Sequence, residues 1–171
     1  MRFELDPPLT AARREEIVTL WLDVSNAGGA VGFVAPVTRA EVGALAHQAF
    51  EDVESGDDRL LLGYEGDRLT AMLLLVSRRF HLCEHWRTVK RVMVSPDAQG
   101  RGYGAALMRE AERVAREIGW DGLFLTVRGG LGIERFYQSL GYKEVGRLPG
   151  ALRVGPDDNR DEIQMWLSLT S

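Results

Sequence analysis

Apolar residues recur along the chain with two different spacings, and the changes of spacing divide it into helices and strands. A spacing of three to four residues is typical of a helix with one buried face. It predicts four helices, which run from Thr10 to Asn26, from Thr38 to Ser55, from the glycines before residue 105 to Gly119, and from Ile133 to Gly141. Glu41 stands three residues after Thr38, which is typical of a capping box at a helix start.

Alternating or continuous apolar runs between these helices predict strands. The predicted strands cover residues 2–5, 60–64, 69–76, 87–94, 123–127, 142–147 and 162–169. The runs at 69–76 and 123–127 are apolar at both alternating positions, which indicates central strands covered on each side. Residues 148–160, rich in Gly, Pro and Asp, are predicted as a loop. The pattern as a whole predicts a mixed α/β layer fold and one domain over residues 1–171.

Composition and charge narrow the function classes. The chain has 25 acidic and 21 basic residues, a net charge of −4, and no long basic block, so we expect no nucleic-acid partner. The one cysteine, Cys83, excludes an intrachain disulfide. The longest apolar run, Ala71–Val76, is far too short to span a bilayer, and the first residues lack the apolar core of a signal peptide. We therefore expect a soluble cytoplasmic protein without a membrane partner.

The most informative stretch is Arg91–Met108, in which an apolar strand ends at Pro96 and a helix follows three alternating glycines, Gly100, Gly102 and Gly104. Glycines let a ligand approach backbone N–H groups, and a helix start leaves about four such groups unpaired. The spacing matches neither a dinucleotide-binding G-x-G-x-x-G nor a P-loop. It suits a diphosphate held by backbone amides without lysine or metal, and the alternative is a tight turn without a ligand.

Here the sequence resembles the GNAT superfamily of N-acetyltransferases, whose signature [Q/R]-x-x-G-x-[G/A] is matched by Gln99–Gly104. A second motif, F-Y-x-x-x-G-[F/Y], is matched by Phe136–Tyr142. The resemblance implies an α/β fold with a mixed, mostly antiparallel sheet of about seven strands, about four flanking helices, and splayed fourth and fifth strands. It implies acetyl-CoA as co-substrate, no metal, and the cofactor-binding residues Val92, Met93, Val94, Gln99, Gly100, Arg101, Gly102, Tyr103 and Gly104.

The resemblance also suggests catalytic residues. By spacing alone Tyr137 would be a core aromatic, whereas members of the family use a tyrosine there to protonate the departing thiolate. The fourth-strand glutamate that serves many members as general base is replaced by Thr88. Glu84 and His85, just before that strand, are the candidate bases. Both could instead be solvated loop residues, and a water chain could do the same work.

These motifs predict an N-acetyltransferase that moves an acetyl group from acetyl-CoA to a primary amine by direct transfer in a ternary complex. The acceptor is predicted to be a small molecule, as in bacterial antibiotic and toxin acetyltransferases. Acceptor contacts are expected from residues 25–37 and 148–160, where Asp157, Asp158 and Asp161 could hold an ammonium group or form a solvated turn. The alternatives are an acetyl-CoA-binding module without turnover, and an acetyltransferase acting on a protein N-terminus or lysine. A second copy of the chain, in a homodimer, is a candidate partner.

Overall fold

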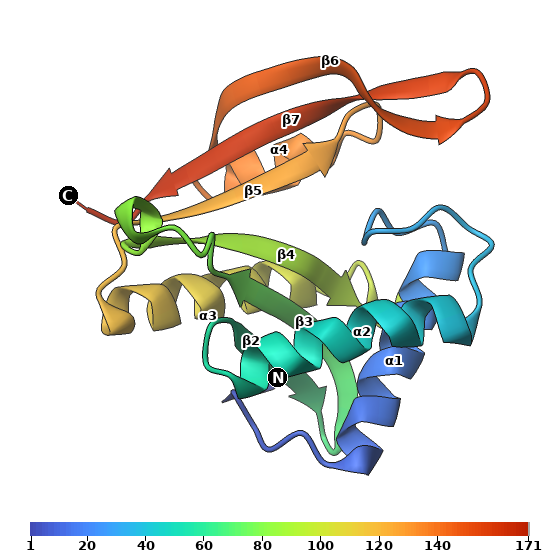
Figure 1. The fold of residues 1–171 in the computed structure, drawn as a ribbon, viewed down its shortest axis with the longest axis vertical. Helices are drawn as coiled ribbons and strands as arrows, with labels where there is room; N and C mark the ends of the chain where they lie inside the picture. Colours follow the sequence, from blue (N-terminus) through green and yellow to red (C-terminus); the bar gives the residue numbers. More distant parts are fainter. Residues whose placement is uncertain (171) are drawn as a thin grey trace.

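The computed structural model describes residues 1–170, and it contains one sheet of seven strands with four α-helices (Figure 1). The strands, with the order β1-β2-β3-β4-β5-β7-β6 across the sheet, are β1 (Arg2–Leu5), β2 (Arg59–Glu65), β3 (Arg68–Val76), β4 (Trp86–Val94), β5 (Gly122–Arg128), β6 (Lys143–Gly155) and β7 (Asp158–Ser168). The helices are α1 (Ala11–Asn26), α2 (Arg39–Glu54), α3 (Tyr103–Ile118) and α4 (Ile133–Ser139), and short 3-10 turns lie at His81–Cys83 and Pro96–Ala98. All neighbouring strands are antiparallel except β4 and β5, so the predicted fold class is confirmed.

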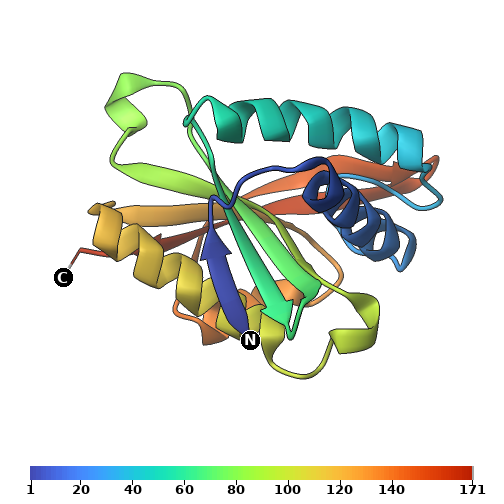
Figure 2. The ribbon, with the colours of Figure 1, turned by 90° about the horizontal axis from the view of Figure 1, so that it is seen from below.

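Helices cover both faces of the sheet: α1 and α2 lie on one side, α3 and α4 on the other (Figures 1 and 2). Each face has its own apolar core, and β3 contributes to both because its alternate side chains point in opposite directions. Met72 and Leu74 pack under α1 and α2, while Leu73 and Leu75 pack under α3. The prediction that this strand is central and covered on each side is confirmed.

The helix ends follow the local sequence signals. The hydroxyl of Thr10 accepts a hydrogen bond from the backbone N–H of Arg13, and Thr38 and Glu41 form the predicted capping box. Gly119 ends α3 in the left-handed conformation, with φ of 89°, which a residue with a Cβ adopts only with strain. These caps fix where α1, α2 and α3 begin and end around the sheet.

Strands β4 and β5 separate along their length, and this splay opens the centre of the sheet. They pair only where Trp86–Thr88 meets Gly122–Phe124. Further along β4 a bulge inserts one residue opposite β3, because Met93 pairs with Met72 but Lys90 pairs with Leu74. Arg91 lies in this bulge with φ of 55°. A bulge bends and twists its strand, so it re-aims the side chains beside the splay.

The prediction of a loop over residues 148–160 was wrong. Strands β6 and β7 continue through it as a long hairpin with Pro156 and Asp157 at the turn. The strand β6 lies at the edge of the sheet, where a proline such as Pro149 breaks no ladder that another strand needs. Its pairing with β7 shifts register three times, so glycines such as Gly146 and Gly150 are accommodated as irregularities of a strand. None of the helices in residues 1–170 is long and apolar enough to cross a membrane.

Candidate active site

The first cavity lies where β4, the turn after it and α4 meet, and we call it the glycine cavity. Its volume is about 510 Å³. It is lined by Val92, Val94, Ala98, Gln99, Gly100, Gly102, Tyr103, Gly104, Ala105, Ile133, Phe136 and Tyr137. The amide of Gln99 donates to the carbonyl oxygen of Val94 at 3.2 Å, which ties the turn back to the strand.

The backbone of the glycine cavity offers unpaired hydrogen-bond donors. Within residues 1–170, no acceptor is found for the N–H groups from Gln99 to Ala105. Gly100 and Gly102 have φ of 75° and 82°, and a Cβ built on either would meet no atom within 4 Å. The donors therefore border open space at the positive end of the α3 dipole, an arrangement that fits a diphosphate.

Two predicted cofactor residues hold this turn in place through their side chains. Arg101 forms an ion pair with Glu65 at the β2–β3 turn, and the Tyr103 hydroxyl donates to the same carboxylate at 2.7 Å. These bonds lower the pKa of the Glu65 carboxyl below its usual range, with Arg101 as the larger cause. The side chain of Met93 is buried under α1 and α2 on the other face. Neither Arg101 nor Met93 is among the residues that line the glycine cavity.

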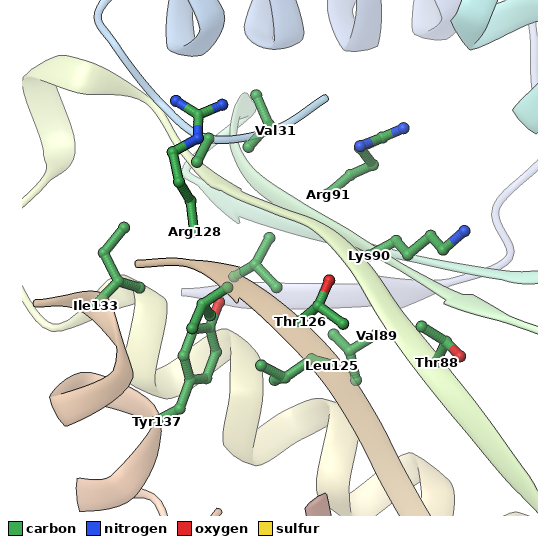
Figure 3. Close-up of a pocket in the computed structure, with 13 residues that line it drawn as sticks. Val31, Thr88, Val89, Lys90, Arg91, Leu125, Thr126, Arg128, Ile133 and Tyr137 are labelled. Atoms are coloured by element: carbon green, nitrogen blue, oxygen red, sulfur yellow. The ribbon is translucent and has the colours of Figure 1, made fainter. Parts of the chain in front are cut away.

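A second cavity, the cleft cavity, occupies the splay between β4 and β5 and has a volume of about 360 Å³ (Figure 3). It is lined by Ala30, Val31, Thr88, Val89, Lys90, Arg91, Val92, Leu125, Thr126, Val127, Arg128, Ile133 and Tyr137. Val92, Ile133 and Tyr137 line both this cavity and the glycine cavity. The two spaces therefore adjoin at these residues, beside the edge of β4 that β5 leaves unpaired.

Tyr137 stands at this junction. It is 7% exposed and its ring makes edge contacts with Phe136 and Tyr142, at centroid distances of 5.0 and 5.8 Å. Figure 3 shows the side chain rising from α4 with its hydroxyl toward β5. Burial raises the pKa of Tyr137 to about 12, so the phenol is protonated at neutral pH. The hydroxyl of the neighbouring Tyr142 is buried and lacks a hydrogen-bond partner within residues 1–170.

The two candidate bases lie away from these cavities. Glu84 and His85 are exposed and precede β4, at the end where it pairs with β5. The carbonyl oxygen of His85 accepts from the backbone N–H of Asp121 at 2.7 Å, which is a structural contact. Neither residue lines the glycine cavity or the cleft cavity, whereas Thr88 lines the cleft. The structure therefore brings Tyr137 and Thr88 to one place and leaves Glu84 and His85 outside it.

A third cavity, the hairpin cavity, extends the cleft toward the β6–β7 hairpin and has a volume of about 380 Å³. It is lined by Ala30, Gly32, Phe33, Val34, Arg91, Thr126, Val127, Arg128, Ala151, Leu152, Arg153, Val154 and Glu162. Segments 25–37 and 148–160, from which acceptor contacts are expected, thus both contribute to its lining. Asp157, Asp158 and Asp161 do not line it, and Asp158 and Asp161 form ion pairs with Arg160 and Arg147.

Sequence reasoning missed the charged residues of the cleft and hairpin cavities, which are Lys90, Arg91, Arg128, Arg153 and Glu162. They come from β4, β5, β6 and β7, so no short motif joins them. Alternation along β5 could have indicated that Arg128 shares a face with Thr126, but not that both face the splay. Within residues 1–170, no group of three or more His, Cys, Asp or Glu side chains could hold a metal ion.

Comparison with known proteins identifies a family, and the similar proteins are named for three different kinds of acceptor: tRNA, a ribosomal protein and an aminoglycoside. The profile of the Acetyltransferase (GNAT) family matches residues 31–142. The tRNA uridine(34) acetyltransferase of Methanocaldococcus jannaschii is 32% identical over 77 residues, which cover 44% of this chain and 14% of that protein. The matched stretch is thus a small part of that relative.

Solved structures share the fold over nearly their whole length. The ribosomal-protein-alanine N-acetyltransferase from Brucella melitensis has a TM-score of 0.80, 18% identity, and coverage of 98% of this chain and 99% of its own. An aminoglycoside 6'-N-acetyltransferase complexed with coenzyme A has a TM-score of 0.75, 14% identity, and coverage of 100% and 98%. At such identities these likenesses establish the fold, and the profile match covers more than half of the sequence. The chain therefore belongs to the Acetyltransferase (GNAT) family, whose members transfer acetyl groups.

Proposed function

We propose that this protein transfers an acetyl group from acetyl-CoA to the primary amine of a small molecule, by direct transfer in a ternary complex. One observation carries the proposal: the glycine cavity, which fits a diphosphate, meets the cleft cavity at Tyr137. Donor and acceptor could therefore bind from opposite sides of the splay and react where the two cavities join. A coenzyme A complex of a protein with this fold supports the choice of donor.

The donor is assigned to the glycine cavity. The N–H groups from Gln99 to Gly104 would hold the diphosphate, with Gly100 and Gly102 leaving room for it. The backbone of Val92, Met93 and Val94 lies past the point where β5 stops pairing, so its free groups can bind the pantetheine arm and polarise the thioester carbonyl. The side chains of Val92 and Val94 line the same cavity.

Tyr137 is assigned the role of acid. The amine nitrogen attacks the thioester carbonyl carbon, a carbon–nitrogen bond forms, and the carbon–sulfur bond breaks with its electron pair going to sulfur. The Tyr137 phenol, protonated at neutral pH, donates to that sulfur. The proton that the nitrogen loses balances the one that sulfur gains. Only Tyr137 among the residues shared by the two cavities carries a proton that could serve.

The base that receives the amine proton is assigned to water in the cleft. No carboxylate or imidazole lines the cleft cavity, and the hydroxyls of Thr88 and Thr126 are too weakly basic. Glu162, which lines the adjoining hairpin cavity, is a carboxylate to which such a water chain could lead. Glu84 and His85 remain candidates from the sequence without support from the lining of the cavities.

A two-step measurement tests the proposal. Acetyl-CoA at 100 times its Kd should stabilise the folded chain by about 2.7 kcal/mol, which a thermal shift would detect. Release of free coenzyme A thiol is then followed over a panel of amines, peptides and tRNA. Stabilisation with thiol release on small amines supports the proposal. Stabilisation without release on any acceptor would favour a binding module, release on peptides or tRNA alone would assign a macromolecular acceptor, and absence of stabilisation would contradict all three.

A further inference from the structure

The cleft and hairpin cavities, which we call the acceptor side, carry a net positive charge, whereas the whole chain is negatively charged. The chain carries a net charge of −4, yet the charged residues that line the cleft and hairpin cavities are Lys90, Arg91, Arg128, Arg153 and one acid, Glu162. The cleft cavity, which is nearer to Tyr137, has three cations and no acid in its lining. Low-dielectric walls focus such a charge on whatever occupies the space.

These cations lack carboxylate partners within residues 1–170. Most other arginines form ion pairs, for example Arg101 with Glu65 and Arg147 with Glu144. Lys90, Arg91, Arg128 and Arg153 form none. Even Glu162, which is the direct cross-strand partner of Arg128, is not paired with it. None of the four cations therefore has a carboxylate within ion-pair distance in residues 1–170. Asp158, which is paired with Arg160, interacts with Arg128 only at longer range, where the arginine helps to lower the pKa of its carboxyl.

Arg91 is the most constrained of these cations. It lies in the β4 bulge with a left-handed φ of 55°, and its guanidinium lies 5.3 Å from the centre of the Trp21 ring. A Cβ built on Gly32 would come within 2.4 Å of the guanidinium, so this glycine packs directly against the charge. Burial lowers the pKa of Arg91, but a guanidinium stays charged at neutral pH. A buried charge without a counterion is costly, which favours a ligand that supplies one.

Arg128 reaches the same region from β5. Its guanidinium donates to the carbonyl oxygen of Phe33 at 3.3 Å, and this bond occupies one of its five donors. Arg91 and Arg128 extend from the two splayed strands on either side of Val31, as Figure 3 shows. Both residues line the cleft and the hairpin cavities, so an anionic group bound in these cavities would lie in the field of both positive charges.

We propose that the acceptor amine carries a negatively charged group, a carboxylate or a phosphate, which the guanidinium groups of Arg91 and Arg128 bind. The inference rests on the proposed function and names its substrate class. Guanidinium donors match the geometry of carboxylate and phosphate oxygens and form charge-assisted hydrogen bonds with them. The same charges repel a polycationic acceptor. The cavities, of about 360 and 380 Å³, suit a small molecule rather than a nucleic-acid strand.

Matched pairs of amines test the charge requirement on the intact chain. Amino acids are compared with their amides, and phosphoethanolamine with ethanolamine, so that the first pair reports carboxylate and the second phosphate. Spermidine serves as the cationic probe. We expect kcat/KM, from thiol release, to be at least about tenfold higher for the anionic member of one pair, as one charge-assisted hydrogen bond accounts for this much.

Variants then locate the preference. Arg128→Gln and Arg91→Gln should each reduce it by about tenfold through KM, while Arg128→Lys should retain part of it because the charge remains. Arg109→Gln removes one exposed positive charge on α3, where the arginine has no ion pair within residues 1–170, and should leave the preference unchanged. A loss that appears equally in Arg109→Gln would mean a long-range charge effect and would contradict the assignment.

The failure of this inference is distinguishable from failure of the proposed function. Turnover of neutral amines or spermidine as fast as the anionic members would overturn the inference while the acetyltransferase stands. Faster acetylation of a peptide or tRNA than of any small amine would also overturn it. If no acceptor is turned over, calorimetry with the same pairs on the coenzyme A complex decides, since equal affinity for both members contradicts the anionic subsite.

Discussion

The glycine cavity is lined by residues of one short stretch, Gln99–Ala105, whose backbone N–H groups lack an acceptor within residues 1–170, whereas side chains from distant segments line the cleft and hairpin cavities. In our proposal the glycine cavity binds its ligand with main-chain N–H groups, and the missing side chains of Gly100 and Gly102 leave room for that ligand. The proposed acceptor side would recognise its ligand with the side chains of Arg91 and Arg128, which come from the two strands that splay, β4 and β5. Because the two sites use different segments, the residues of the acceptor site can be substituted without altering the backbone of the donor site.

Substitutions on the two sides should therefore change different measured parameters. Damage to the glycine cavity should weaken acetyl-CoA binding, damage to the segment over the cleft should raise KM for the amine, and damage at the junction should lower kcat. A substitution that changes the wrong parameter would show that the two sides are not separate.

The largest effect is expected at the junction. Tyr137→Phe removes the proposed acid and should lower kcat by about 100-fold, within the range for loss of general acid catalysis. Acetyl-CoA affinity and KM for the amine should change little, because the ring and its contacts with Phe136 and Tyr142 remain. Steady-state thiol release and calorimetry measure the three parameters.

The matched control is Tyr142→Phe. It removes the neighbouring hydroxyl, which is buried without a partner, so kcat should hold and the free energy of unfolding should rise by about 1 kcal/mol. An unchanged kcat in Tyr137→Phe would remove this residue from the mechanism. A drop in both variants would point to packing of α4 rather than to proton donation.

The next effect is expected on the glycine side. Gly102→Val places a branched side chain at a φ of 82° and into open space where the diphosphate would lie. We expect acetyl-CoA affinity to fall by about tenfold to 100-fold, equivalent to about 1.4 to 2.8 kcal/mol, as charge-assisted hydrogen bonds are lost. Calorimetry measures the affinity, with KM for the amine followed in parallel.

Gly119→Val is its control at the opposite end of the same helix. Gly119 has φ of 89° and also has no atom within 4 Å of a built Cβ, so the backbone strain is matched. Each variant should lose about 1–2 kcal/mol of unfolding free energy. Only Gly102→Val should lose affinity, and equal losses of affinity would mean that strain in α3, not the cavity, is responsible.

The same contrast explains what the sequence could predict. The elements of the fold followed from local periodicity and caps, and the glycine turn followed from its three glycines within six residues. These signals are local, because a helix cap or a backbone anion site is encoded by neighbours in the chain. The long β6–β7 hairpin was missed since edge strands tolerate Gly and Pro, which otherwise mark loops.

The acceptor side could not be predicted to the same depth. Arg91 follows Lys90 in a strand that reads as regular, and nothing local signals that a bulge turns it toward Trp21. Arg128 reads as the polar end of a strand. That both line the same two cavities depends on how β4 and β5 diverge, which is set by long-range packing. The carboxylates Asp158 and Asp161, predicted as candidates for binding an ammonium, are instead neutralised by Arg160 and Arg147.

A smaller effect is expected on the segment over the cleft. The Asn26 side chain accepts from the Val37 N–H at 2.9 Å and donates to the Val37 carbonyl at 3.0 Å, so it closes the segment between α1 and α2. Asn26→Ala should cost about 1–2 kcal/mol of unfolding free energy. The segment lines both acceptor cavities, so KM for the amine should rise by about fivefold, about 1 kcal/mol, with acetyl-CoA affinity unchanged.

Gln48→Ala is the control for Asn26→Ala. It removes another side-chain amide, whose bond to Asp52 lies within α2 and does not involve the segment between α1 and α2. Both amine KM and acetyl-CoA affinity should stay at their original values in this variant. If Asn26→Ala weakened acetyl-CoA as much as the amine, the glycine side would depend on the segment over the cleft, and the separation of the two sides would fail.

The smallest effect concerns the burial of the junction itself. Tyr137 has its pKa raised to about 12 by burial, against about 10 in the unfolded chain, so ionisation opposes folding between these values. Stability from this group is present below pH 10 and is lost as pH rises toward 12. Between pH 8 and pH 11 the loss should be about 1 kcal/mol smaller in Tyr137→Phe, as measured by urea unfolding. An equal loss of unfolding free energy in the two proteins would mean that water reaches the phenol. The junction of the two cavities would then be filled with solvent and not closed by the buried tyrosine ring.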